Sequence, residues 1–282
     1  MTDVLPPRAG VGLKLEHAAE ILADMPDVGW FEVHPETFMV EGGPRHRLLA
    51  QIRERYPLSL HGVALSLAGT DPLDEDHLRA LRRLVDRYAP ASVSEHLAWS
   101  AHGDLYFGDL LPVPLTDETL ATVTANIHRT QEVLGRTILI ENPSHYLRLP
   151  GRAREEVDFL VEVAKRTGCG LLLDVENVLI SAHNVGYDAE AYLDALPGEL
   201  IGEIHLAGHE TDPAEPDLLI DSHSRPVAPD VWSLLRHLLA RVGPKPVLVE
   251  WDNDVPAWPV LFAEMQKAAF CLEAHADPER AR

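Results

Sequence analysis

Short apolar runs alternate along the chain with longer runs in which apolar residues recur at helical spacing. Eight of the short runs hold five or six residues, are rich in valine, isoleucine and leucine, and begin near proline, glycine or another small residue. These features predict β-strands. The predicted strands are residues 9–13, 29–34, 57–62, 91–96, 137–142, 170–174, 201–206 and 246–251.

The longer runs carry helix signals at their ends and along their length. Residues 116–135 begin with Thr116 before two acidic residues and end at Gly135, which provides an N-cap, an acidic first turn and a glycine stop. In residues 73–88, the leucines at 78, 81 and 84 recur at helical spacing. The predicted helices are residues 43–55, 73–88, 116–135, 154–167, 188–195, 228–242 and 256–272.

The order of these runs predicts the fold. Eight strands, each followed by a helix-like run, favour a parallel sheet closed into a (β/α)8 TIM barrel. An open doubly wound sheet is the alternative, but no GxGxxG motif follows the first strand. The 282 residues suit one domain over 1–282, with an ordered barrel over about 8–272 and a frayed polar tail over 273–282.

Composition and charge exclude several classes of protein. The formal charge is 24 − 45 = −21, which argues against nucleic acid as a partner. No apolar run is long enough to span a membrane and the first residues lack the apolar core of a signal peptide, so we expect a cytoplasmic protein without membrane contact. Cys169 and Cys271 form no CxxC pair, which argues against a disulfide framework or a cysteine–zinc site.

Polar residues end seven consecutive predicted strands. In a parallel barrel the carboxyl ends of all strands open onto one face, so these residues converge in space. Buried carboxylates are costly unless cations compensate them, and imidazole with carboxylate suits iron, zinc and manganese. A carboxylate also bridges two ions in two-metal sites. The residues are His34, Glu36, His61, Glu95, His96, Glu141, Asn142, Asp174, Glu176, Asn177, His205, His209 and Glu250, with Asp221 and His223 in the loop before the last strand.

A single histidine at a strand end is usually structural, so the metal hypothesis depends on the recurrence of such residues. Taken one at a time, five residues are as well explained by supporting a ligand or contacting substrate as by ligation: His34, Glu36, Glu95, Glu176 and His209. We expect the histidines on helical runs to be exposed to solvent, namely His17, His46, His77, His128, His237 and His275. We expect Trp30, Trp99 and Trp251 to border the mouth of the barrel, chiefly as packing residues.

Seven segments resemble the family once called DUF692, now described as multinuclear non-heme iron-dependent oxidative enzymes (MNIO). The resemblance runs from about Gly10 to Glu250, and the family is similar to the xylose-isomerase-like TIM barrels. The segments are GWFEVHPETFM (29–39), SLHGVALSL (59–67), SEHLAWS (94–100), ILIENPSHYL (138–147), GCGLLLDVENV (168–178), EIHLAGH (203–209) and LIDSHSRPV (219–227). Glu176 departs from the family pattern, which often has asparagine there.

The resemblance implies three metal positions. The first would use His61, His96 and Glu141. The second would share Glu141 as a bridge and add Asp174, His205 and Glu250, and these four residues are the implied catalytic set. The third would use Asn177, Asp221 and His223. Asn142 joins His34, Glu36, Glu95, Glu176 and His209 as residues that would support the ligands or contact substrate.

The resemblance also implies a reaction. It implies an oxidase with two or three iron ions in a mixed Fe(II)/Fe(III) state, which uses O2 as co-substrate. The substrate would be a residue, with cysteine the first choice, in a ribosomally made peptide precursor, and a small separate protein would bind the leader of that peptide. The residues alone leave other activities open: a metal-dependent hydrolase similar to the phosphodiesterase endonuclease IV, a sugar isomerase, or a metal-binding scaffold without turnover.

Overall fold

Eight parallel strands close into a barrel in the computed structural model, which describes residues 4–276. Their spatial order is β1-β12-β9-β8-β7-β4-β3-β2, which confirms the predicted TIM barrel. Each barrel strand falls within one of the predicted runs. The strands are β1 (Ala9–Gly12), β2 (Phe31–Val33), β3 (Leu58–Gly62), β4 (Ser92–His96), β7 (Leu139–Glu141), β8 (Gly170–Asp174), β9 (Ile201–Leu206) and β12 (Val247–Val249).

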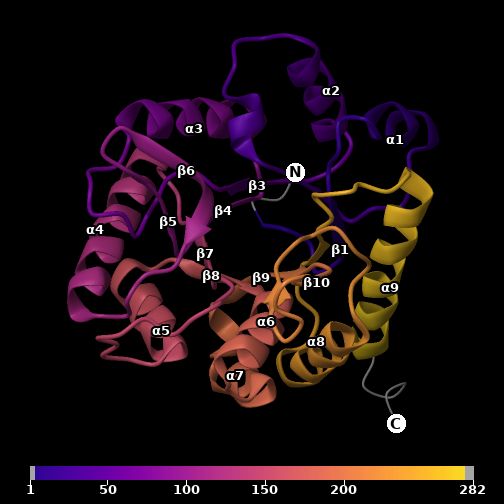
Figure 1. The fold of residues 1–282 in the computed structure, drawn as a ribbon. Coiled ribbons are helices and arrows are strands. Elements are labelled where there is room, and N and C mark those ends of the chain that lie inside the picture. Colours follow the sequence, from indigo (N-terminus) through magenta and orange to yellow (C-terminus); the bar gives the residue numbers. More distant parts are fainter. Residues whose placement is uncertain (1–3, 277–282) are drawn as a thin grey trace.

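The helices form a ring around these strands (Figure 1). All seven predicted helices are present. Thr116 caps α4 by accepting a hydrogen bond from the Thr119 N–H at 3.1 Å, and Gly135 ends it at φ 64°. Two further helices, α1 and α6, were not predicted. The helices are α1 (Ala18–Asp24), α2 (Pro44–Arg53), α3 (Glu75–Tyr88), α4 (Asp117–Leu134), α5 (Glu156–Thr167), α6 (Val175–Val185), α7 (Ala189–Ala195), α8 (Pro229–Val242) and α9 (Trp258–Ala276), with 3-10 turns at Pro35–Phe38 and Gly198–Leu200.

The two faces of the barrel strands differ in polarity. Alternate residues such as Val93 and Ile204 point outward and pack with the helices in the main hydrophobic core. The inward positions of several strands are polar although they are buried, and Ser59, Ser94 and Glu203 are all fully buried there. Barrel interiors are usually filled by branched apolar side chains. Polar side chains therefore occupy the interior of the barrel as well as the carboxyl ends of its strands.

Two short hairpins extend from the carboxyl ends of the strands and were not predicted. The first, β5 (Trp99–His102) and β6 (Leu105–Leu111), lies between β4 and α4. The second, β10 (Glu210–Thr211) and β11 (Leu219–Ile220), lies between β9 and α8. Both follow directly on strands that end in candidate ligands, so they lie on the side of the barrel where we expect the site.

Several predictions about individual residues are wrong. Trp30 lies at the amino ends of the strands and not at the mouth: its Nε1 donates to the Arg8 carbonyl, and its ring occupies the space above Gly10, where a Cβ would lie 2.5 Å from it. His17 and His46 are buried, at 6% and 2% exposure, and not exposed. His46 contacts the Tyr88 hydroxyl and the Val40 carbonyl, which satisfies both ring nitrogens.

The end of the chain also differs from the prediction. Helix α9 continues to Ala276, so residues 273–276 are helical and not frayed, while residues 277–282 lie outside the described part. Across residues 4–276, none of the helices combines the length and the apolar composition that crossing a bilayer requires.

Candidate metal centre

The barrel brings the predicted ligands to one place at the carboxyl ends of the strands. Strand register sets pairs of them side by side, because His96 is the partner of Glu141 and Asp174 is the partner of His205. A cavity of about 380 Å³ opens above them. Asp174 and His205 are fully buried beneath it. The other predicted ligands line the cavity directly: His61, His96, Glu141, Asn177, Asp221, His223 and Glu250.

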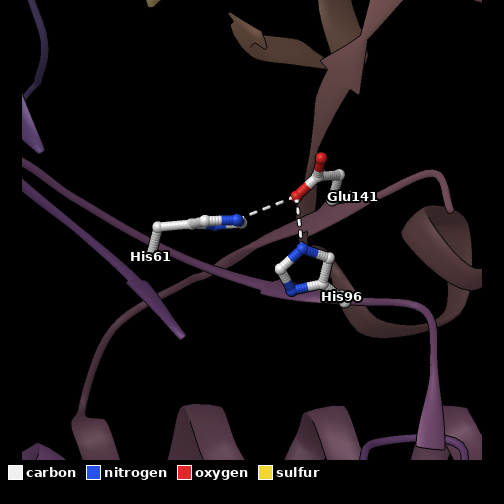
Figure 2. Close-up of side chains that lie close together, drawn as sticks. All are labelled: His61, His96 and Glu141. Carbon is white, nitrogen blue, oxygen red and sulfur yellow. Dashed lines mark ion pairs between the residues drawn. The ribbon is translucent and has the colours of Figure 1, made fainter. Parts of the chain in front are cut away.

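The first predicted position is formed by two imidazoles and one carboxylate (Figure 2). The Nε2 atoms of His61 and His96 lie 3.0 and 3.1 Å from the same oxygen of Glu141, Oε2. The two rings are 4.4 Å apart between centroids. The opposite nitrogens are held from behind, since His61 Nδ1 contacts Ser94 Oγ at 2.8 Å and His96 Nδ1 contacts the Gly62 carbonyl at 2.9 Å.

The tautomer of His96 determines which of its ring nitrogens can bind a metal ion. The Gly62 carbonyl only accepts, so His96 Nδ1 carries the proton and donates it. Burial lowers the pKa of His96, which favours the neutral ring. The Nε2 lone pair of a neutral ring then faces a carboxylate oxygen at 3.1 Å, which is a contact between two acceptors. A cation between the two atoms would turn this repulsion into ligation.

The pKa values of His61 and Glu141 are shifted in opposite directions. Burial acts to lower the pKa of His61, but the neighbouring carboxylates of Glu141 and Glu32 raise it to about 10. Burial acts to raise the pKa of Glu141, but the imidazoles beside it lower the value to about 2. Both groups therefore favour their charged forms, and a metal ion can take the place of the proton that His61 holds.

The second predicted position lies deeper, against the first. Donor atoms of Glu141, Asp174 and His205 all lie within 4.8 Å of one another. His205 Nδ1 is 3.2 Å from Glu250 Oε2. Burial and the charges of Glu141 and Glu176 raise the pKa of Asp174 well above its usual value. Neighbouring negative charge without compensation produces such a shift, and a bound cation would remove it.

The third predicted position is at the side of the cavity. His223 Nε2 lies 2.7 Å from Asp221 Oδ1, and His223 has the left-handed backbone conformation, φ 47°. A non-glycine residue held at positive φ is strained by about 1–3 kcal/mol, which is common at functional sites. The Asn177 Nδ2 donates to the Asn142 carbonyl at 3.1 Å, so its side-chain oxygen is left for another partner.

Unpartnered polar atoms test whether a metal fits these residues. Within residues 4–276, buried oxygens of Glu141, Asp174, Asn177 and Asp221, with the Nε2 of His223, have no hydrogen bond. Glu141 Oε2 and His223 Nε2 do have close polar neighbours, but none in hydrogen-bond geometry. Buried polar atoms are almost always satisfied in folded proteins. The unpartnered atoms come from all three predicted positions, so the donor set fits a cluster of metal ions.

Two predicted supporting residues contact the backbone of predicted ligands. Asn142 exchanges two hydrogen bonds with the backbone of Asp174, at 2.9 and 3.0 Å. His34 lines the cavity, with Nε2 3.3 Å from Asp252 Oδ2 and Nδ1 3.1 Å from the His61 carbonyl. Asp252 in turn pairs with Lys14, so a short charged chain borders the cavity.

The other four supporting residues do not line the cavity. Glu95 lies on the outer face of β4, where its carboxylate accepts from the Leu65 and His96 N–H groups at 2.9 and 2.8 Å. Glu36 accepts from the Val63 N–H and pairs with His77, which is therefore not freely solvated. Glu176, in the first turn of α6, pairs with His209 at 3.1 Å. These contacts lie in and beside the loops that carry the predicted ligands.

Sequence reasoning missed three groups of residues at the site. Glu32 and Glu203 lie in mid-strand beneath His205, and the available signal was an acidic residue inside each of two apolar runs. Lys14 lies in the first loop. Tyr106, Asp109 and Leu110 of β6 line the cavity, and the glycine at the turn of an alternating segment was the signal for that hairpin.

Comparison with known proteins gives consistent matches along the chain. The family model described as RiPP precursor modification enzyme MbnB/TglH/ChrH matches residues 8–273. A UPF0276 protein of Caulobacter sp. (strain K31) is 57% identical over 262 residues, covering 93% of this chain and 95% of its own length. A UPF0276 protein of Bordetella bronchiseptica is 51% identical over 270 residues, covering 95% and 93%.

Solved structures show the fold. A xylose isomerase domain protein from Alicyclobacillus acidocaldarius aligns with a TM-score of 0.63 at 17% identity, covering 96% of this chain and 99% of its own. Endonuclease IV from Thermus thermophilus aligns with a TM-score of 0.62 at 16% identity, covering 95% and 99%. At such low identity the likeness establishes a xylose-isomerase-like TIM barrel and carries no activity with it.

Proposed function

Since the chain belongs to the MbnB/TglH/ChrH family of RiPP precursor modification enzymes, we propose that it is a multinuclear iron-dependent oxidase. It uses O2 to modify a residue, with cysteine the first choice, in a ribosomally made peptide precursor. The observation that carries the proposal is that the donor groups of the first and second positions overlap at one cavity and share Glu141, with the third donor group beside the same cavity. Membership of the family supports a peptide as the substrate, and the donor groups support a bound redox metal.

The residues divide into roles at three positions. His61 and His96 would hold the first ion, Asp174, His205 and Glu250 the second, and Glu141 would bridge the two. Asn177, Asp221 and His223 would hold the third ion. Bound iron would supply the one-electron chemistry and the activation of O2 that side chains lack. Zinc and manganese accept the same donors, so the identity of the metal needs measurement.

The cavity wall has the composition expected for a peptide substrate. Tyr106 and Leu110 from β6 and Tyr146 from the loop after β7 line the cavity together with the histidines and carboxylates. A volume of about 380 Å³ is enough for one or two side chains. One peptide residue would therefore enter while the flanking residues remain on the rim, and the aromatic wall would keep water from the reacting side chain.

The proposed reaction involves a partner protein and a cellular location. We propose that a small separate protein presents the leader of the precursor, because residues 4–276 form the barrel, its helices and its hairpins. The reaction would take place in the cytoplasm, where ribosomal peptides are made. The endonuclease and the sugar isomerase remain as outcomes of the test below, since only the fold supports them.

The test is a direct measurement of metal, oxygen and peptide. Protein purified without oxygen is analysed for metals, loaded with Fe(II) or Zn(II), and mixed with a cysteine-containing precursor encoded beside its gene. We expect the iron form alone to consume O2 and to change the mass of the peptide. Failure of the iron form to consume O2 with that peptide, or equal modification by the zinc form, would overturn the oxidase. Cleavage of abasic DNA by the zinc form would indicate the hydrolase, and interconversion of an aldose and a ketose would indicate the isomerase.

A further inference from the structure

Two carboxylates lie inside the barrel, one layer below the candidate metal centre. Glu32 comes from the middle of β2 and Glu203 from the middle of β9, and they are 3% and 0% exposed. Neither belongs to the three predicted metal positions. Two buried acids in the core of a barrel carry a large desolvation cost, so they need a partner that repays it.

Their shared partner is His205. Its Nε2 lies 3.3 Å from Oε1 of Glu32 and 3.3 Å from Oε1 of Glu203. Its Nδ1 faces the opposite way and lies 3.2 Å from Glu250 Oε2, on the side of the metal centre. Ser92 donates a hydrogen bond to the second oxygen of Glu203 at 3.0 Å and so fixes that carboxylate from below.

This placement decides which nitrogen of His205 is available to a metal. A neutral imidazole has one N–H and one lone pair, and its partners select between the two tautomers. An ion on the Glu250 side would take the Nδ1 lone pair, which leaves the proton on Nε2. There Glu32 and Glu203 accept it. The acid pair would thus fix both the tautomer and the orientation of the ring.

The candidate ligand histidines of the first two positions differ in what supports them. His61 and His96 are held at Nδ1 by neutral groups, the Ser94 hydroxyl and the Gly62 carbonyl, and present Nε2 to the first position. His205 is held at Nε2 by charged groups and presents Nδ1 to the second position. A carboxylate behind a ligand histidine makes the imidazole a stronger donor than a neutral acceptor does. The two positions are therefore electronically unequal.

We propose that Glu32 and Glu203 are positioning residues. They hold His205 through its Nε2 proton and make its imidazole a stronger electron donor to the metal, so that the second position stabilises the more oxidised iron. The inference rests on the metal centre of the proposed function, but not on the peptide or on the product. It assigns a role to two mid-strand acids that touch neither the cavity nor a substrate.

The experiment compares Glu203→Gln and Glu32→Gln with the parent protein, all loaded with Fe(II) without oxygen. Glu264→Gln is the matched control, because Glu264 is equally buried at 5% exposure but accepts from the Val227 N–H outside the barrel interior. Iron stoichiometry, affinity, reduction potential and the Mössbauer spectrum are measured. The metal-free circular dichroism spectrum confirms that each variant is folded.

We expect both variants to keep the parent stoichiometry while the affinity for one ion falls by about 10–100-fold. The Mössbauer signal of that ion should change and its potential should rise, while Glu264→Gln matches the parent. Ser92→Ala, which removes only the support of Glu203, should shift the same signal by less. Unchanged affinity, spectrum and potential in both variants would overturn the proposal, as would the loss of a whole ion, which would make the acids direct ligands. A parent protein that binds no iron would instead refute the proposed function.

Discussion

At the scale of single residues, Glu141 is in contact with three other predicted ligands. One of its oxygens faces both His61 and His96, and its other oxygen lies 3.5 Å from the Asn177 amide. It is also the residue that joins the first and second predicted positions. A side chain shared by two ions loses more on substitution than a ligand of one ion, because both coordination shells are opened.

We expect Glu141→Gln to lose iron from both positions. The amide keeps the size of the side chain but not the charge that offsets the imidazoles, so affinity should fall by more than the roughly 10–100-fold seen for residues that only support ligands. Elemental analysis after desalting without oxygen measures the loss. Glu36→Gln, in which the altered carboxylate binds the Val63 N–H, should retain the parent metal content. Full iron content in Glu141→Gln would exclude the bridge.

A second residue-scale prediction concerns His145, which lies away from the metal centre. It pairs with the Glu156 carboxylate, which also accepts from the Tyr192 hydroxyl at 2.7 Å. Burial acts to lower the pKa of His145, but the hydrogen bond to Glu156 and its charge raise it above 6.5. A folded-state pKa raised above the unfolded value stabilises the protein fully below pH 6.5, and this stability is lost as the pH rises through the folded value.

His145→Gln should therefore destabilise the protein more at about pH 6 than at about pH 9. The difference in the free energy of unfolding should be about 1–3 kcal/mol at the lower pH, the usual range for a hydrogen bond to a charged group, and smaller at the higher pH. Urea unfolding of the metal-free proteins across this range measures it. His128→Gln, at an exposed position of α4, is the control and should show no such trend. A penalty that grows with pH would contradict the assignment.

The site residues at strand ends could be predicted from the sequence, and the two acidic residues in mid-strand were missed. Residues at strand ends, such as His61 and Asp174, were found because the end of an apolar run is visible and the barrel brings all ends together. Glu32 and Glu203 were missed because only strand ends were considered, although both break an apolar run. His46 was placed on the wrong side of its helix, since a helical run alone does not show that a hydroxyl and a carbonyl await its ring.

At the scale of elements, the β5–β6 hairpin is the part of the structure most suited to contact a substrate. Leu105, Tyr106 and Phe107 are 65%, 60% and 47% exposed. Of these, Tyr106 lines the cavity, whereas Phe107 packs edge-on against Trp99. Exposed aromatic groups beside an active-site cavity commonly bind the parts of a ligand that do not react.

Tyr106→Ala should weaken peptide binding without changing metal content. Loss of an aromatic contact of this kind costs about 1–2 kcal/mol, so KM for the precursor should rise by about 5–30-fold with little change in kcat. Leu105→Ala on the same strand is the matched control, because Leu105 is equally exposed but does not line the cavity. Equal effects of the two substitutions would show that the hairpin does not contact the peptide through this wall.

The elements themselves were predictable where hydrophobic periodicity was strong. All eight barrel strands and seven helices follow from it, because the outer face of each strand and the inner face of each helix must be apolar. Helix α6 was missed because it begins at the residue after β8, with Asp174 serving both as strand end and as N-cap through a 2.6 Å bond from the Asn177 N–H. No turn residue separates the two elements in the sequence.

At the scale of the whole molecule, the formal charge of −21 is partly concentrated at one end of the barrel. Carboxylates of Glu141, Asp174, Asp221, Glu250 and Asp252 lie around a single cavity or beneath it. Each divalent ion bound there would neutralise two of these charges. The folded state without metal therefore carries a repulsion that the unfolded chain relieves by separating the same groups.

Metal should consequently stabilise the fold. A ligand that binds only the folded state adds RT ln(1 + [L]/Kd) to the free energy of unfolding, which is about 2.7 kcal/mol for one ion at one hundred times its Kd. For a protein of this size we expect the melting temperature to rise by about 5–10 °C when Fe(II) is added without oxygen. Calorimetry of the metal-free and loaded forms, with Glu141→Gln as the control, measures the rise. Since the substitution removes the shared ligand, the variant should gain clearly less than the parent. Equal melting temperatures with and without iron in the parent would mean that the carboxylates are held apart by protons and protein contacts alone, and the metal centre would have to be abandoned.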